Sequence, residues 1–303
     1  MTASPYVSLL AVLLVAPALP GIATRTKSLL TGRRGAPVLQ LYFDLAKLAR
    51  KGVVYSRTTT LVFRIAPVVL AAAVLVAAFL LPLDGRAPIF GFTGDLVAFA
   101  GLLALGRFAL VLAGLDTGSS FEGMGASREV TVASFAEPAL LLSLTVLVLV
   151  TGSLSLGGML GAPLAGAWPV QAPSMVLAGA SLFMLLLAEN ARVPIDDPAT
   201  HLELTMIHEV IILDHSGPDL GLILYAGAVK FALFGTLVVS VLIPRGRFDP
   251  WIAVPMLLGG LVVVAVLVGV VEAAMARLRM DRIPQFLVAA AALAGFGVIL
   301  LLR

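Results

Sequence analysis

The stretch LVFRIAPVVLAAAVLVAAFLL, residues 61–81, decides the fold of this chain. A helix needs about 20 mostly apolar residues to cross the hydrocarbon core of a bilayer, and this stretch has that length with one charge, Arg64. Seven other stretches approach the same length. The eight expected spans are Tyr6–Ala23, Leu61–Leu81, Leu96–Leu115, Phe135–Leu156, Val170–Ala188, Leu220–Ile243, Trp251–Ala274 and Ile283–Leu302. The sequence therefore predicts an all-α, polytopic membrane helix bundle with about eight transmembrane helices, forming a single domain over residues 1–303.

The composition indicates that lipid surrounds most of the chain. Hydrophobic residues make up 60% of it, charged residues 12%, and the mean hydropathy is +1.08, whereas about a quarter of the residues in soluble domains are charged. The chain has no cysteine, so it cannot hold an iron–sulfur cluster or supply thiolates to a nickel site. We therefore expect that it binds no metal or redox cofactor itself. It also lacks a nucleic-acid-binding motif.

The basic residues predict an orientation. If alternate loops lie on one side, fourteen of the 20 Lys and Arg residues share one face, and Arg107 and Lys230 lie within spans. The other four are Arg86, Arg245, Arg247 and Arg303. Because basic loops remain in the cytoplasm, we expect a multi-pass membrane protein with both termini outside. The first apolar run has no basic residue before it, so we expect it to be retained as a helix rather than cleaved.

The loops of the expected cytoplasmic face differ in charge. The first, Thr24–Thr60, is basic, and within it Tyr42–Arg50 is predicted to form an amphipathic helix at the membrane surface. The fifth, within Glu189–Asp219, carries seven acids against the single Arg192. The third includes the stretch Gly118–Glu129, which we predict to be a flexible glycine–serine loop opening the fourth span. The acids of this third loop are Asp116, Glu122 and Glu129. Positive-inside sorting does not require these acids, so they point to proton handling or partner binding.

The stretch AENARVPIDDP, residues 188–198, is the most informative for chemistry. Pro194 disfavours helix before it, and Asp197 followed by Pro198 is a typical helix start, so we expect a helix over Pro198–Leu213. A plain structural interpretation is that Asp196 and Asp197 only cap this helix. On the same interpretation, Glu189 only pairs with Arg192 three residues later.

Ionisable residues inside the spans are costly and usually have partners. Arg107, Glu137 and Lys230 are therefore functional candidates, although Glu137, Glu272 and Arg64 could instead snorkel to the interface. The three histidines, His201, His208 and His215, recur every seven residues. On a helix this step separates them by about 10 Å, so they cannot share a metal ion. We expect them to make surface or partner contacts.

Four segments carry a resemblance to a known family. They are Gly32–Gly35 continuing to Asp44 and Lys47, Gly118–Glu129, Glu189–Glu209 with Asp214–Gly217, and Arg277–Asp281. At these residues the chain resembles the respiratory complex I subunit 1 family. Within that family it is most similar to the formate hydrogenlyase subunit 4 branch, the membrane anchor subunits of group 4 [NiFe] hydrogenases. The likeness extends over essentially the whole chain.

The resemblance implies a prokaryotic inner-membrane subunit that docks a cytoplasmic redox arm and couples electron transfer to proton movement. By position, the resemblance places Glu189, Arg192 and Asp196 on the motif after the fifth span, and Glu203 and Glu209 on the acidic helix that follows. With the other acidic candidates, the residues expected in a proton path or at the junction with the redox arm are Glu122, Glu129, Glu137, Glu189, Arg192, Asp196, Glu203, Glu209 and Asp214. Docking loops would use Arg33, Arg34, Asp44, Lys47, Arg277, Arg279 and Asp281. Expected partners are the lipid bilayer, hydrogenase large and small subunits, a ferredoxin-like iron–sulfur subunit and antiporter-like membrane subunits. The [NiFe] centre and the iron–sulfur clusters would belong to those partners.

Two other functions remain open from the sequence. The chain could be the quinone-site subunit of a complex I-like NADH:quinone oxidoreductase, but Pro198–His201 stands where quinone-type members carry a more acidic run, which weakens the case for a bound quinone. It could also be a stand-alone solute or ion transporter, although the paired broken helices typical of such proteins are not evident. As a hydrogenase anchor or as a quinone-site subunit, the chain would be a non-redox subunit of an oxidoreductase complex and would not be catalytic alone.

Overall fold

A computed structural model describes residues 4–196 and 206–303 of the chain. These residues form helices and loops and no strand. The helices are α1 (Ser4–Val15), α2 (Ala18–Leu30), α3 (Gln40–Leu48), α4 (Leu61–Phe79), α5 (Asp95–Asp116), α6 (Ser120–Thr151), α7 (Leu156–Leu160), α8 (Ala162–Glu189), α9 (His208–Ile211), α10 (Gly217–Leu242), α11 (Pro250–Ala274), the 3-10 turn η1 (Met280–Arg282) and α12 (Ile283–Leu301). The predicted all-α class is confirmed.

Seven of the described helices are long and apolar enough to cross a membrane, and the bent pair α1 and α2 makes an eighth candidate span. The two helices of this pair meet at 42°. The break falls at Pro17, which has no N–H to continue the hydrogen-bond ladder of α1. The prediction of about eight spans is therefore confirmed, but the first span is broken and ends at Leu30 instead of Ala23.

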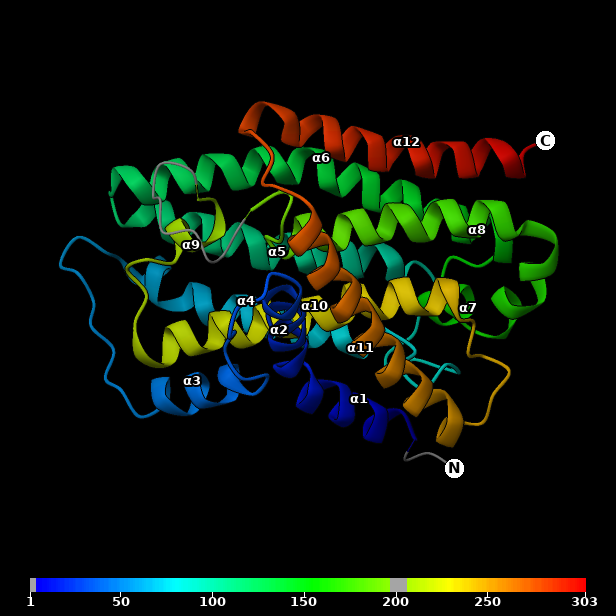
Figure 1. Cartoon of the computed structure of the whole chain (residues 1–303), viewed down its shortest axis with the longest axis horizontal. Helices are drawn as coiled ribbons and strands as arrows, with labels where there is room; N and C mark the ends of the chain where they lie inside the picture. The colour runs from blue at the N-terminus through cyan, green and yellow to red at the C-terminus, as the bar shows by residue number, and fades with distance from the viewer. Residues whose placement is uncertain (1–3, 197–205) are drawn as a thin grey trace.

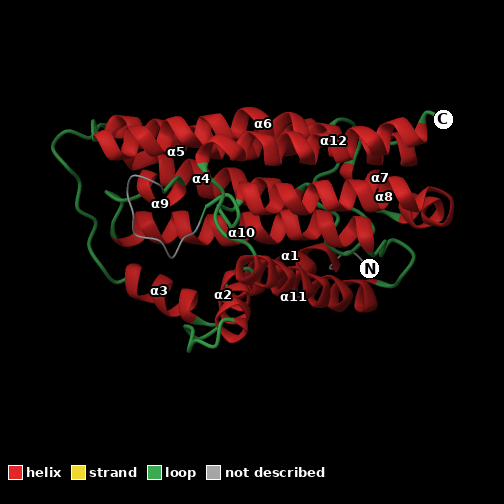
Figure 2. Cartoon of the chain, turned by 45° about the horizontal axis from the view of Figure 1, so that its top comes forward, coloured by secondary structure: helices red, strands yellow, loops and turns green. Residues whose placement is uncertain are grey.

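The long helices lie side by side along the longest axis of the molecule, and α11 crosses them obliquely (Figure 1). α10 is the most buried span, with Phe231 and Phe234 enclosed by its neighbours. α12 packs along α6 and α8 on one side of the bundle (Figure 2). α2 packs across α11, where Gly269 has no room for a Cβ beside Ala23 and Thr26.

One end of the bundle carries the connections that the sequence assigns to the basic face, and we call it the basic end. They are residues 31–60, 117–119, 190–196 with 206–216, and 275–282. α3 lies in the first of them, within two residues of the predicted amphipathic helix at either end. The opposite end carries the connections 80–94, 152–161 and 243–249.

One loop prediction is wrong, and one helix prediction is only partly covered by the described residues. Gly118–Glu129 is not a flexible loop, because α6 begins at Ser120 and runs unbroken for 32 residues. Gly125 in its first turns lets α9 approach so closely that a Cβ would clash with Val210. The predicted helix Pro198–Leu213 lies partly outside the described residues, as does the proposed cap at Asp197. In its described part only α9 is helical.

Candidate functional site

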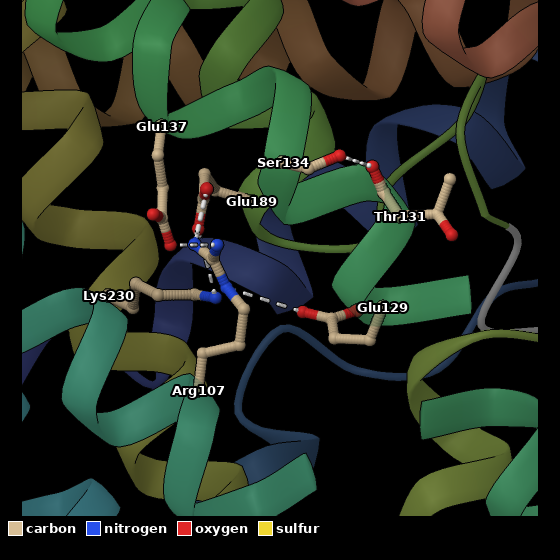
Figure 3. Close-up of polar contacts among 7 residues, drawn as sticks. All are labelled: Arg107, Glu129, Thr131, Ser134, Glu137, Glu189 and Lys230. Carbon is tan, nitrogen blue, oxygen red and sulfur yellow. Dashed lines mark hydrogen bonds and ion pairs between the residues drawn. The ribbon is translucent and has the colours of Figure 1, made fainter. Parts of the chain in front are cut away.

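Five charged side chains from four helices meet inside the bundle, and we call them the Arg107 cluster. Arg107 comes from α5, Glu129 and Glu137 from α6, Glu189 from the last turn of α8 and Lys230 from α10. Figure 3 shows the three carboxylates gathered around the guanidinium of Arg107. The cluster therefore joins segments that lie far apart in the sequence.

The distances define a network centred on Arg107. Its Nη2 lies 2.5 Å from both carboxylate oxygens of Glu189, and its Nη1 lies 2.9 Å from Oε1 of Glu137. Nε of Arg107 is 3.6 Å from Oε1 of Glu129. Nζ of Lys230 is 3.6 Å from Oε2 of Glu189. Glu189 thus bridges the two cations that the sequence places within spans.

The centre of the Arg107 cluster is buried, and the charges of the cluster do not cancel. Arg107 and Glu189 are each 8% exposed. Three carboxylates face two cations, so the fully ionised cluster carries one negative charge. Burying charges is costly, and each ion is tolerated because its partners are in place. The arrangement can therefore respond to a proton taken up or released by any of its carboxylates.

The structure corrects the local interpretation of Glu189. Its carboxylate contacts Arg107 and Lys230, whereas Arg192 pairs with Glu272 of α11 at 3.4 Å. Snorkelling therefore does not describe Glu272, whose carboxylate is buried. Glu137 is half exposed but ion-paired to Arg107. Arg64 lies over the ring of Tyr55.

Asp196 links the connection that follows α8 to the connection between α11 and α12 through an ion pair. One carboxylate oxygen lies 3.0 Å from Nη2 of Arg277. The other accepts the backbone N–H groups of Ile207 and His208 at 3.0 and 3.2 Å, so Asp196 caps the start of α9. The capping interpretation thus describes part of its role. The contact with Arg277 is a second part, which local spacing did not predict.

A second cluster of polar residues lies around Asp214 and His215, just before α10 begins. Oε1 of Glu122 accepts the backbone N–H of Asp214 at 3.0 Å. The ring of the next residue, His215, stacks on Phe63 with centroids 4.0 Å apart and planes 6° apart. His215 is buried, so the expectation of a surface or partner contact is wrong for this residue.

His215 is expected to make the protein less stable in acid. Burial lowers its pKa from 6.5 to about 4, although Asp219 and Asp214 favour the charged ring. As the pH falls from about 6.5 to 4, the unfolded chain binds a proton here that the folded chain does not. His215 therefore does not reduce the free energy of unfolding above this window, and it reduces it progressively as the pH falls through the window. Thermal unfolding from pH 7 to 4 should show a shallower fall in Tm for His215→Phe than for the wild type; equal slopes would contradict this.

A cavity of about 290 Å³ opens beside the Arg107 cluster at the basic end. Its walls come from α2, α3, α8, α9 and α10. The charged residues among its lining are Asp44, Glu189, Arg192, Asp196, Glu209 and Lys230. The rest of the lining is largely apolar, including Ile223 and Phe231. The cavity therefore combines an apolar body with charged groups at one side.

The other predicted site residues are either exposed at the basic end or lie outside the described residues. Arg33, Arg34 and Lys47 are exposed at the basic end, as is the pair Arg279–Asp281 with its atoms 3.3 Å apart. Glu203 lies outside the described residues. Among the described residues, no group of three His, Asp or Glu side chains is placed to hold a metal ion.

The sequence did not predict the burial of His215 or the contact between Tyr55 and Asp219. The Tyr55 hydroxyl donates to Asp219 at 2.8 Å, and this bond raises the pKa of Tyr55. Nearby, the backbone N–H of Val54 donates to Ser216. These contacts join segments about 160 residues apart. The signal in the sequence that points to this region is the segment Asp214–Gly217, part of one of the four that carry the family resemblance.

Comparison with known proteins agrees with this architecture. Formate hydrogenlyase subunit 4 of Escherichia coli (strain K12) is 33% identical over 300 residues, which are 97% of this chain and 94% of that protein. Hydrogenase-4 component C of the same organism is 36% identical over 236 residues, 78% of this chain and 73% of that protein. A chain of the membrane-bound sulfane sulfur reductase, an archaeal respiratory membrane complex, has the same fold, with a TM-score of 0.82 over 98% of both chains at 19% identity. The NADH dehydrogenase family model matches residues 4–302, so this chain belongs to that family, which is the family of complex I subunit 1.

Proposed function

We propose that this chain is the membrane anchor and proton-path subunit of a multisubunit hydrogenase complex of the formate hydrogenlyase type. Its relatives named hydrogenase-4 component C and formate hydrogenlyase subunit 4 support the class of complex. The observation that carries the proton role is the buried Arg107 cluster, because ionisable groups held inside a membrane bundle are costly unless they are used.

The basic end is the docking face of the proposal, and we place it in the cytoplasm with both termini outside. Exposed cations in the first connection, Arg33, Arg34 and Lys47, offer a surface for an acidic partner. The partners proposed are the hydrogenase large and small subunits, a ferredoxin-like iron–sulfur subunit and antiporter-like membrane subunits. The nickel–iron centre and the iron–sulfur clusters lie in those partners, since a chain without cysteine offers no thiolate ligands.

The cavity at the basic end favours a second candidate, a quinone-site subunit. Its size and largely apolar lining suit a small amphipathic ring, with charged groups on one side to orient it. Purification of the complex in a mild detergent separates the two functions. Nickel and iron in the purified complex, with hydrogen evolution or uptake, support the hydrogenase role. Quinone reduction without nickel supports the second candidate, and a chain that runs alone and transports a solute contradicts both.

Glu189→Gln tests the proton role. It removes a titratable group from the Arg107 cluster at nearly constant shape, and Glu129 and Glu137 still contact Arg107. We therefore expect normal assembly but a fall in coupled turnover of about 100-fold, as when a proton-transfer group is lost. Hydrogenase turnover and proton movement are measured together on the complex in sealed vesicles.

The control is Asp249→Asn, which alters an exposed carboxylate paired with Arg86 at the opposite end. This variant should behave as the wild type in both assays. If Glu189→Gln also retains full turnover and proton movement, the proton role of the Arg107 cluster is wrong. The carboxylate then serves only to compensate the buried cations.

A further inference from the structure

His215 is a buried titratable residue that the Arg107 cluster does not use. Its ring is 4% exposed, and neither Nδ1 nor Nε2 has a hydrogen-bond partner among the described residues. The flat stack on Phe63 fixes the plane of the ring. Packing alone does not explain a histidine here, because a phenylalanine would fill the same space without burying two unpaired nitrogens.

Glu122 of α6 is a second buried ionisable residue, and it contacts the residue that precedes His215. It is 1% exposed, and its Oε1 is held by the backbone N–H of Asp214, the residue before His215. Its Oε2 is buried with no hydrogen-bond partner among the described residues. The two ring nitrogens of His215 and one carboxylate oxygen of Glu122 are thus buried without hydrogen-bond partners in the described part of the chain, beside one short segment of the basic end. A polar site of this kind is suited to hold water.

α6 links this segment to the Arg107 cluster. Glu122, Glu129 and Glu137 follow one another at steps of seven and eight residues, which place them within about 80° of one another around the helix. The steps correspond to rises of about 10 and 12 Å. Glu129 and Glu137 contact Arg107, so Glu122 is the acid of this row nearest the basic end.

We propose that His215 and Glu122 form a proton relay that passes protons between water at the basic end and the Arg107 cluster. The inference rests on the proposed proton role of that cluster. A hydronium ion in a water chain protonates the bare ring nitrogen of His215. The other ring nitrogen then releases its own proton, through water, to Oε2 of Glu122. The ring is left as the opposite neutral tautomer and resets by rotation or by reverse exchange, and no electrons change place.

The surroundings of His215 suit a relay more than a permanent charge. With a pKa of about 4, about one ring in a thousand is protonated at pH 7. The neutral ring offers one donor and one acceptor, as a relay requires. Charged groups near it are Asp214, Asp219 and Glu122, and Tyr55 is engaged with Asp219. These acids stabilise the brief cationic state without fixing it.

His215→Phe in the intact complex is the decisive variant. It keeps the stack on Phe63 and removes both nitrogens, so we expect assembly and Tm to be kept or raised. Coupled turnover should fall by about 100-fold, and the solvent deuterium isotope effect should rise because proton uptake has become slow. Phe63→Leu is the matched variant: it loosens the stack and keeps the nitrogens. We expect it to lower Tm while most turnover per assembled complex remains.

The opposite pattern, with full turnover in His215→Phe and loss in Phe63→Leu, would overturn the relay and make His215 a packing residue. The result for Glu189→Gln separates this failure from that of the proposed function. If Glu189→Gln lowers coupled turnover but His215→Phe does not, the relay alone is wrong. If neither variant changes turnover, both the relay and the proton role of the Arg107 cluster are wrong.

Discussion

Replacing Arg107 with leucine is expected to prevent the chain from accumulating as a folded subunit. The change leaves Glu129, Glu137 and Glu189 with Lys230 as their remaining cation in the cluster. Removing one partner of a buried ion pair costs about 3–5 kcal/mol because the other charge stays buried without compensation. Membrane extracts analysed by size-exclusion chromatography and thermal unfolding should show little monodisperse protein and a lower Tm.

Two further variants make this result interpretable. Arg86→Leu breaks an ion pair with Asp249 in which both side chains are largely exposed, so it should cost about 0–1 kcal/mol. Adding Glu189→Gln to Arg107→Leu removes one of the three uncompensated acids and should recover part of the lost stability. Equal stability for Arg107→Leu and Arg86→Leu would show that the Arg107 cluster does not stabilise the bundle.

Replacing Gly269 with leucine is expected to displace α2. A Cβ at this position would lie 2.5 Å from the backbone oxygen of Ala23 and 2.6 Å from Cβ of Thr26. Neither atom is the end of a flexible side chain, so one helix must move, at a cost of about 1–3 kcal/mol or more. Because α2 forms one wall of the cavity, we expect the cavity to change shape with the loss of stability.

Because the chain has no cysteine, a single introduced thiol can report this movement directly. Thr24→Cys places a single thiol on the α2 wall of the cavity, and its rate of reaction with a maleimide reports access to that wall. Gly269→Leu should change the rate and lower Tm. Gly259→Leu on the same helix is the control, because a Cβ there meets nothing within 4 Å. The prediction fails if the two variants react and unfold alike.

The spans could be predicted from the sequence because the length of an apolar run is a local property. The same local reasoning failed for the start of α6. Glycines at 118, 123 and 125 suggested a loop. The stretch is nevertheless helical from Ser120, and Gly125 packs closely against Val210 of a distant segment. Tertiary packing of this kind overrides intrinsic preference.

The sequence predicted which charged residues belong to the candidate site, but not which of them contact one another. Rarity of charge within spans identified Arg107, Glu137 and Lys230. The local rule for Glu189 gave Arg192 as partner, whereas its actual partner Arg107 lies 82 residues away. The buried position of His215 could not be predicted from its local spacing, because its ring stacks on Phe63 of α4, a distant segment.

The length of α6 has a mechanical consequence. The helix begins fifteen residues before the expected span at Phe135, so about 22 Å of rigid rod extends beyond it. Pro138 interrupts the hydrogen-bond ladder near the base of this rod, where a helix bends most easily. A tilt of about 5° there moves the tip by about 2 Å. The first turns of α6 pack against α9, so a partner that displaces this end would shift Glu129 and Glu137 against Arg107 without entering the bundle.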